Sequence, residues 1–215
     1  MILLYQRYAA TTPERQAELD LCAEMNARSL LFEEIRGIDV DVETRMTYGD
    51  FFRLCASEYN GKLCVVANSD ILFDDTARLL ETVVAPGRIV ALTRWEPLTR
   101  WQRAGHSPRM LGHFYMERFY SGTQDSWAFI GGELVGIGDA VPLGFVGCDQ
   151  AILGECYGAN IEIADPALDI KTWHQHADET RPHRPSMSGV YGYPELTTTL
   201  LSYRVITHGW PLSAR

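Results

Sequence analysis

An asparagine and an aspartate follow a short, unbroken apolar run of the chain. Asn68, Ser69 and Asp70 come directly after residues 62–67 (Lys-Leu-Cys-Val-Val-Ala). Such a run is typical of a parallel strand that is buried on both faces, and ligands bind at the carboxyl ends of these strands. A carboxylate placed there can hold Mg²⁺ or Mn²⁺, and the metal in turn can hold a diphosphate. The alternative is that Asp70 and Asp74 only cap the helix expected after them.

Two histidines form a second candidate group. His174 and His176 are two residues apart, so on a strand both imidazoles point to one side. A mixed carboxylate and imidazole set suits Mn²⁺ or another first-row metal better than Ca²⁺, although a pair of surface or hydrogen-bonded histidines is the plainer interpretation. Arg181 follows closely and could bind a phosphate through two hydrogen bonds. A zinc site would need cysteines at short spacing, and none lies near these histidines.

Three further residues could act on a sugar. Asp149 lies where a loop is expected to meet a helix, and it could take the proton of an attacking hydroxyl if the sugar is transferred with inversion. The alternative for Asp149 is the N-cap of that helix. Asp125 could hydrogen-bond to sugar hydroxyls, and Trp127 could stack on a sugar face. A turn followed by a core tryptophan is the plainer interpretation of this pair, and residue chemistry alone favours it.

The elements that must position these residues alternate between strand and helix. This alternation predicts a doubly wound α/β sheet with helices on both faces. Residues 96–122 interleave arginine and aromatic residues and are expected to form a long functional loop with some helix. We expect one domain over residues 1–184, and a tail over 185–215 that packs on it or is partly flexible. The strands are expected at residues 1–8, 29–35, 42–46, 62–67, 88–95, 126–130, 161–163 and 168–173, and the helices from Thr12 onward, at 48–59 and at 148–158.

The composition is that of an ordinary globular chain. With 46% hydrophobic and 22% charged residues, the 215-residue chain is expected to form a packed core. The net charge of −9 argues against binding a polyanion over the whole surface. The five cysteines are odd in number, lack Cys-x-x-Cys spacing and are expected to be buried thiols. The sequence shows no signal peptide and no apolar run of membrane-spanning length, so we expect a cytoplasmic protein. It also contains no dinucleotide-binding glycine motif, P-loop or nucleophile elbow.

Short motifs along the chain, taken together and in order, resemble those of GT-A-like glycosyltransferases of bacteria and viruses. The resemblance covers about residues 1–184. The motifs are Pro13-Glu14-Arg15, Tyr48-x-Asp50, Asn68-Ser69-Asp70-Ile71, Thr93-Arg94-Trp95-Glu96, Gln124-Asp125-Ser126-Trp127, Gly147-Cys148-Asp149, and His174-x-His176 with Arg181.

The resemblance implies a GT-A-like mixed sheet that binds a nucleotide diphosphate sugar, most commonly of uridine, together with Mn²⁺ or Mg²⁺. The Asp-x-Asp motif of that fold corresponds to residues 68–70, where Asn68 replaces the first carboxylate. Asp70 with His174 or His176 would hold the metal, and Asp149 would be the base of an inverting enzyme. The implied donor contacts are Gln6, Arg15, Asn68, Asp70, Arg94 and Arg181, with Asn26 as a weaker one.

The acceptor stays open between a glycan, a small molecule and a modified base in DNA. Arginine and aromatic residues within 96–122 favour the DNA base, since such mixtures contact the backbone and stack on bases, whereas the net charge counts against it. A third interpretation is a non-catalytic module that binds a sugar nucleotide. Asn68 and the short chain are the features that suggest it.

Overall fold

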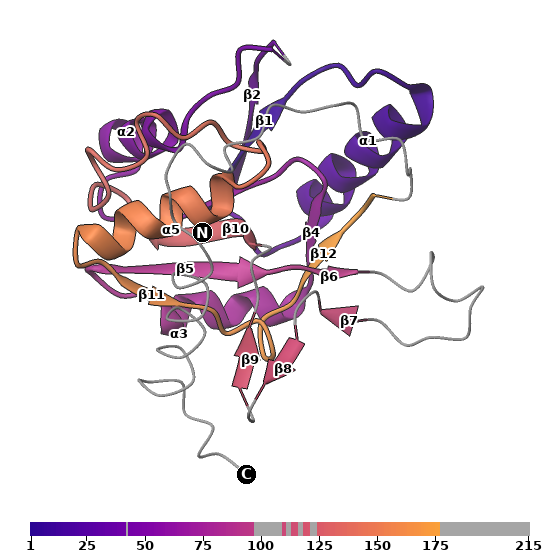
Figure 1. Cartoon of the computed structure of the whole chain (residues 1–215). Coiled ribbons are helices and arrows are strands. Elements are labelled where there is room, and N and C mark those ends of the chain that lie inside the picture. The colour runs from indigo at the N-terminus through magenta and orange to yellow at the C-terminus, as the bar shows by residue number, and fades with distance from the viewer. Residues whose placement is uncertain (42, 97–108, 111–112, 116–117, 121–123, 177–215) are drawn as a thin grey trace.

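The computed structural model describes residues 1–41, 43–96, 109–110, 113–115, 118–120 and 124–176. Its main sheet has six strands in the order β11-β5-β10-β3-β1-β2 (Figure 1). Strand β10 runs antiparallel to both of its neighbours, and the other pairs are parallel. The chain is therefore an α/β protein with a mixed sheet, as predicted. The strands are β1 (Ile2–Arg7), β2 (Glu34–Asp39), β3 (Leu63–Ala67), β5 (Arg88–Thr93), β10 (Gln124–Ile130) and β11 (Glu162–Ala164).

Helices cover both faces of this sheet. On one face, α2 (Tyr48–Glu58) and α5 (Cys148–Gly158) bury their apolar sides against alternate residues of β3 and β10. On the other face, the 3₁₀ turn η1 (Asp75–Leu79) and the short helix α3 (Leu80–Val83) pack on the intervening residues. Since side chains alternate between the faces of a strand, the wholly apolar β3 contributes to both cores. This explains why its sequence shows no polar alternation.

Helix α1 (Pro13–Arg28) begins where the sequence predicts. Thr12 is the N-cap, and its hydroxyl accepts a hydrogen bond from the backbone N–H of Arg15. Pro13 is tolerated at the first helical position because its missing N–H would have no helical partner. The cap places Arg15 in the first turn, which matters for the site described below.

A second sheet brings the end of the described chain back to the carboxyl edge of β3. Its four strands lie in the order β4-β12-β6-β7, and Figure 1 shows β4 and β12 beside α1. Strand β12 runs antiparallel to β4, with His174 opposite Ile71. The sequence did not predict this sheet. The strands are β4 (Ile71–Phe73), β6 (Trp95–Glu96), β7 (Arg109–Met110) and β12 (Thr172–His174), and a separate hairpin pairs β8 (His113–Tyr115) with β9 (Arg118–Tyr120).

One predicted strand has no counterpart among the described residues, and others are displaced. Residues 29–33 form a turn rather than a strand, because the Ser29 hydroxyl accepts the N–H of Leu31, and the strand starts at Glu34. Residues 43–46 form no strand, because Asp41 accepts the N–H of Glu43 and closes a local turn. The two late strands start later than predicted, at Glu162 and at residue 172.

Other expectations fall partly within the described residues. All five cysteines are free and buried, as predicted. None of the helices in the described part of the chain has the length and apolar character needed to cross a bilayer. The expected loop at residues 96–122 contains short strands in its described pieces. The predicted tail at 185–215, and residues 177–184 of the predicted domain, lie outside the described residues.

Candidate metal centre and ligand pocket

Three predicted metal ligands meet at the carboxyl end of β3. The Nε2 atom of His174 lies 3.3 Å from Oδ2 of Asp70, and Nδ1 of His176 lies 3.7 Å from the same oxygen. One ligand atom from each of the three side chains lies within 4.8 Å of the others. The pairing of β12 with β4 produces this meeting, and it is extended by a 2.8 Å hydrogen bond from the N–H of Gln175 to the carbonyl of Asp70.

The geometry and burial of the three residues fit a divalent first-row metal ion. Oxygen and nitrogen ligands about 2.1 Å from a metal stand roughly 3.0–3.4 Å apart, close to the two distances observed. Asp70 and His174 are buried, and His176 is nearly so. The Nε2 atom of His176 is buried and has no hydrogen-bond partner among the described residues. Buried polar atoms without a partner are costly, and a water bonded to this nitrogen, on the side of the ring away from Asp70, would reduce that cost.

Arg15 completes the surroundings of Asp70. Its guanidinium donates to Oδ2 of Asp70, to the carbonyl of Gln175 at 2.9 Å and to the carboxylate of Glu18 at 2.8 Å. Burial by itself would raise the pKa of Asp70. The two histidines and Arg15 outweigh it and hold that pKa well below its usual range. The carboxylate is therefore ionised and able to act as a ligand at neutral pH.

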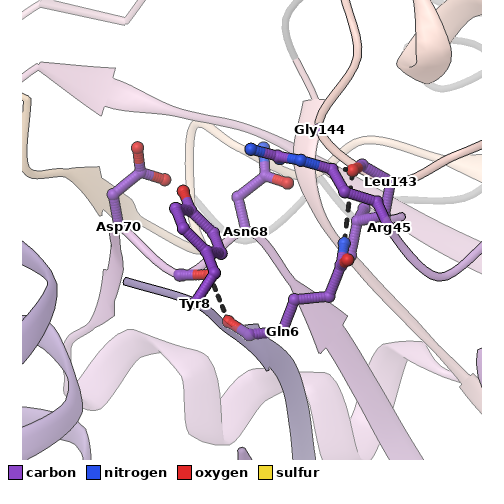
Figure 2. A pocket seen from close by; sticks show the side chains of 8 residues that line it. Gln6, Tyr8, Arg45, Asn68, Asp70, Leu143 and Gly144 are labelled. Atoms are coloured by element: carbon purple, nitrogen blue, oxygen red, sulfur yellow. Dashed lines mark hydrogen bonds between the residues drawn. The ribbon is translucent and has the colours of Figure 1, made fainter. Parts of the chain in front are cut away.

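A pocket opens beside the three ligands, with Asp70 in its wall. Its empty space, including the part that is open to solvent, is about 280 Å³. It lies outside the carboxyl ends of β1 and β3, the adjacent strands from which the chain crosses over in opposite directions, where α/β sheets bind ligands. Figure 2 shows the Asp70 carboxylate on one side of the pocket, across the Tyr8 ring from Gln6. The lining residues are Gln6, Tyr8, Arg45, Asn68, Ser69, Asp70, Leu143 and Gly144.

Tyr8, Arg45 and Gly144 belong to this pocket and were missed from the sequence. The Arg45 guanidinium lies over the Tyr8 ring, 4.8 Å from its centroid. Gly144 has φ +82°, and a Cβ there would come within 2.4 Å of the Arg45 guanidinium. Tyr8 could have been found, since it ends the first predicted strand. Arg45 lies in a segment wrongly expected to be a strand, and it had no local signal.

Asn68 is held by a buried ion pair next to the pocket. Its Nδ2 donates to Oδ1 of Asp125, and Arg94 donates to the other carboxylate oxygen at 2.7 Å. Asp125 is only 8% exposed. The antiparallel pairing of β10 with β3 explains the contact, because the start of β10 lies beside the end of β3. Asp125 and Arg94, both predicted to contact ligand, bond to each other, and Asp125 also positions Asn68. Their predicted ligand contacts stay predictions.

Replacing Asn68 with aspartate is expected to lower stability, because it sets a second carboxylate directly against the buried one of Asp125. We expect a loss of roughly 1–3 kcal/mol in the free energy of unfolding at pH 7, measured by urea denaturation. The loss should shrink as the pH is lowered, because a proton on either carboxyl removes the repulsion between them. An Asn68→Asp variant as stable as the wild type at pH 7 would contradict this account of the cluster.

Asp149 lies in the first turn of α5 and is not its N-cap. The cap residue is Gly147, at φ +83°, and it forms no side-chain cap bond. The Asp149 carboxylate accepts the N–H of Gln150 at 2.9 Å. Although Asp149 is partly exposed, the protein atoms packed around its carboxyl group, and next the negative charge of Asp125, raise its pKa to about 7. A carboxyl with this pKa can exchange protons near neutral pH, as a general base must.

Several other predicted site residues have structural roles. Trp127 is fully buried in the core on the α2 and α5 face, so the expectation that it stacks on a sugar is wrong. Both ends of the Asn26 side-chain amide hydrogen-bond to the backbone of β4, so this residue ties α1 to β4. Gln6 lines the pocket, but its amide bonds to the carbonyl of Leu143 and the N–H of Met46. Arg181 lies outside the described residues.

The only support for the resemblance to GT-A-like glycosyltransferases is the set of short motifs in the sequence. Searches of protein-family models and of curated proteins found no match to this chain.

Proposed function

We propose that this chain is a metal-dependent glycosyltransferase of the GT-A type, which moves a sugar from a nucleotide diphosphate donor to an acceptor hydroxyl. One observation carries the proposal: Asp70 belongs both to the three-ligand group and to the wall of the adjoining pocket. A ligand in that pocket therefore meets the candidate metal centre. The motifs that resemble GT-A-like enzymes supply the reaction class, and Mn²⁺ or Mg²⁺ is the proposed cofactor.

The proposed roles divide between binding at the pocket and proton transfer by Asp149, which is not among the residues that line the pocket. Asp70, His174 and His176 would hold the ion, which when bound supplies positive charge to stabilise a diphosphate leaving group. Asn68 keeps a fixed orientation because its amide nitrogen is bonded to Asp125, and its oxygen is the end that can accept a ligand hydroxyl. Asp149, with its pKa of about 7, would take the proton of the acceptor hydroxyl.

Donor hydrolysis without an added acceptor tests the proposal most directly. The purified protein is incubated with a panel of uridine, guanosine, cytidine and thymidine diphosphate sugars, and released nucleoside diphosphate is measured by chromatography. We expect release from at least one donor in Mn²⁺ and none in EDTA. Release that is equal in Mn²⁺ and EDTA would refute the role given to Asp70 and the two histidines.

The same panel separates the catalytic proposal from a binding module. If calorimetry detects a nucleotide sugar bound in Mn²⁺, but long incubation with varied acceptors yields no product, the chain is a binding protein. The DNA-base acceptor was suggested by residues 96–122, most of which lie outside the described residues. Glucosylation of hydroxymethylated DNA, assayed at about 50 mM salt to favour phosphate contacts, is the test of that acceptor.

A further inference from the structure

Nitrogen atoms of three side chains converge on a single oxygen of Asp70. Arg15 and the two candidate histidine ligands all approach Oδ2. The oxygen that would bind the metal is thus already engaged by a permanent positive charge. Arg15 is well buried, and its charge is screened little by solvent.

We propose that Arg15 is a positioning residue which lowers the affinity of the Asp70, His174 and His176 group for a bare divalent cation. The inference rests on the proposed function and deepens it. With neutral histidines, Asp70 and Glu18 together with Arg15 leave one net negative charge around the centre. Asn68, which also lines the pocket wall beside Asp70, is neutral and adds no negative charge.

The three-ligand group binds the bare ion weakly, and its affinity for the ion rises when an anionic ligand fills the pocket. The negative charges of a diphosphate would replace those that Arg15 compensates. Each partner then raises the affinity of the protein for the other by the same factor, because coupling between two binding equilibria is reciprocal. The site is thereby set for an ion that arrives with, or after, an anionic ligand.

Two substitutions with opposite expected effects test the inference. Arg15→Met keeps an unbranched side chain and removes the charge, so the affinity for Mn²⁺ alone should rise roughly tenfold. Even in a water-like dielectric, a unit charge a few ångströms from a divalent ion has an effect of this size. Glu18→Gln leaves Arg15 less compensated, so the affinity for Mn²⁺ should fall, by about two- to fivefold at this greater distance from the ion. Calorimetry or paramagnetic resonance of bound Mn²⁺ measures both.

The opposite signs separate an electrostatic role from a structural one. If Arg15 only holds the fold together, both substitutions should weaken Mn²⁺ binding, and that result would overturn the inference. Arg15→Lys, which keeps the charge, should bind Mn²⁺ within about threefold of the wild type. If Arg15→Met does not fold, as judged by its thermal transition, Arg15→Gln takes its place: it removes the charge but can still donate to Asp70, so it should also bind Mn²⁺ more tightly than the wild type, and weaker binding would overturn the inference.

Inorganic pyrophosphate, premixed with Mn²⁺, provides the second readout. In the wild type, pyrophosphate should increase the amount of Mn²⁺ bound to protein at a fixed concentration of free ion. In Arg15→Met, this increase should be smaller. An increase that is the same in both proteins would count against the inference. If the wild type binds no Mn²⁺ with or without pyrophosphate, the proposed function fails as well, so the two failures are distinguishable.

Discussion

An Asp70→Asn variant is expected to lose Mn²⁺ binding almost completely, with an affinity at least about a hundredfold below that of the wild type. The substitution keeps the shape of the side chain but removes the only carboxylate within the three-ligand group. Release of nucleoside diphosphate from a sugar donor should fall to the level seen in EDTA. Calorimetric titration with Mn²⁺ and the donor-hydrolysis assay measure the two effects.

Asp70→Asn also removes the ion-pair partner of a buried arginine, so a stability control is needed. Breaking a buried pair by neutralising one partner costs about 3–5 kcal/mol, and urea denaturation should show a loss of that order. Asp75→Asn makes the same chemical change at an exposed residue of η1, five positions further on. It should change neither Mn²⁺ affinity nor stability appreciably. Equal Mn²⁺ affinity in Asp70→Asn and wild type would refute the proposed metal centre at Asp70.

Replacing Asp149 with asparagine is expected to lower turnover by about 10²–10⁴-fold while Mn²⁺ affinity stays unchanged. This is the usual contribution of a positioned general base. Wild-type turnover should rise with pH through about 7, following the ionisation of Asp149. Steady-state kinetics between pH 5.5 and 8.5 check both statements. A variant with wild-type turnover would assign the proton transfer to another group.

The same substitution should stabilise the folded protein above neutral pH. The pKa of Asp149 is about 7 in the fold and near 3.8 in the unfolded chain, so between these values the folded state binds more protons. The stability of the wild type therefore falls as pH rises from about 4 to 7, whereas Asp149→Asn escapes that loss. Its gain in melting temperature should be largest near pH 8 and vanish below pH 4, with Asp75→Asn again as control. Loss of turnover together with a gain in stability would exclude misfolding as the cause of inactivity.

The sequence predicts the site better than it predicts the residues that support the site. Asp70 and the two histidines were predicted as a group by type and spacing, because metal ligands are drawn from few residue types, and the structure brings the three together. Trp127 was a candidate next to Asp125, two residues away, but the pairing register of β10 shifts between Gln124 and Ser126. Trp127 lies within the hydrophobic core, whereas Asp125 pairs with Arg94. Arg45 had no signal at all, since its contact with Tyr8 depends on the path of an irregular segment.

The sequence alone determined those features that a few neighbouring residues encode. The apolar run of β3, the Thr12 cap of α1 and the helix α5 follow from burial pattern and capping, which act over one or two turns. Only the tertiary structure decided which distant groups meet. The β12–β4 register sets His174 beside Asp70, and Arg15 reaches Asp70 from 55 residues away. Such contacts depend on how the whole chain packs, because hydrogen bonds and charges act only where the fold brings their partners within a few ångströms.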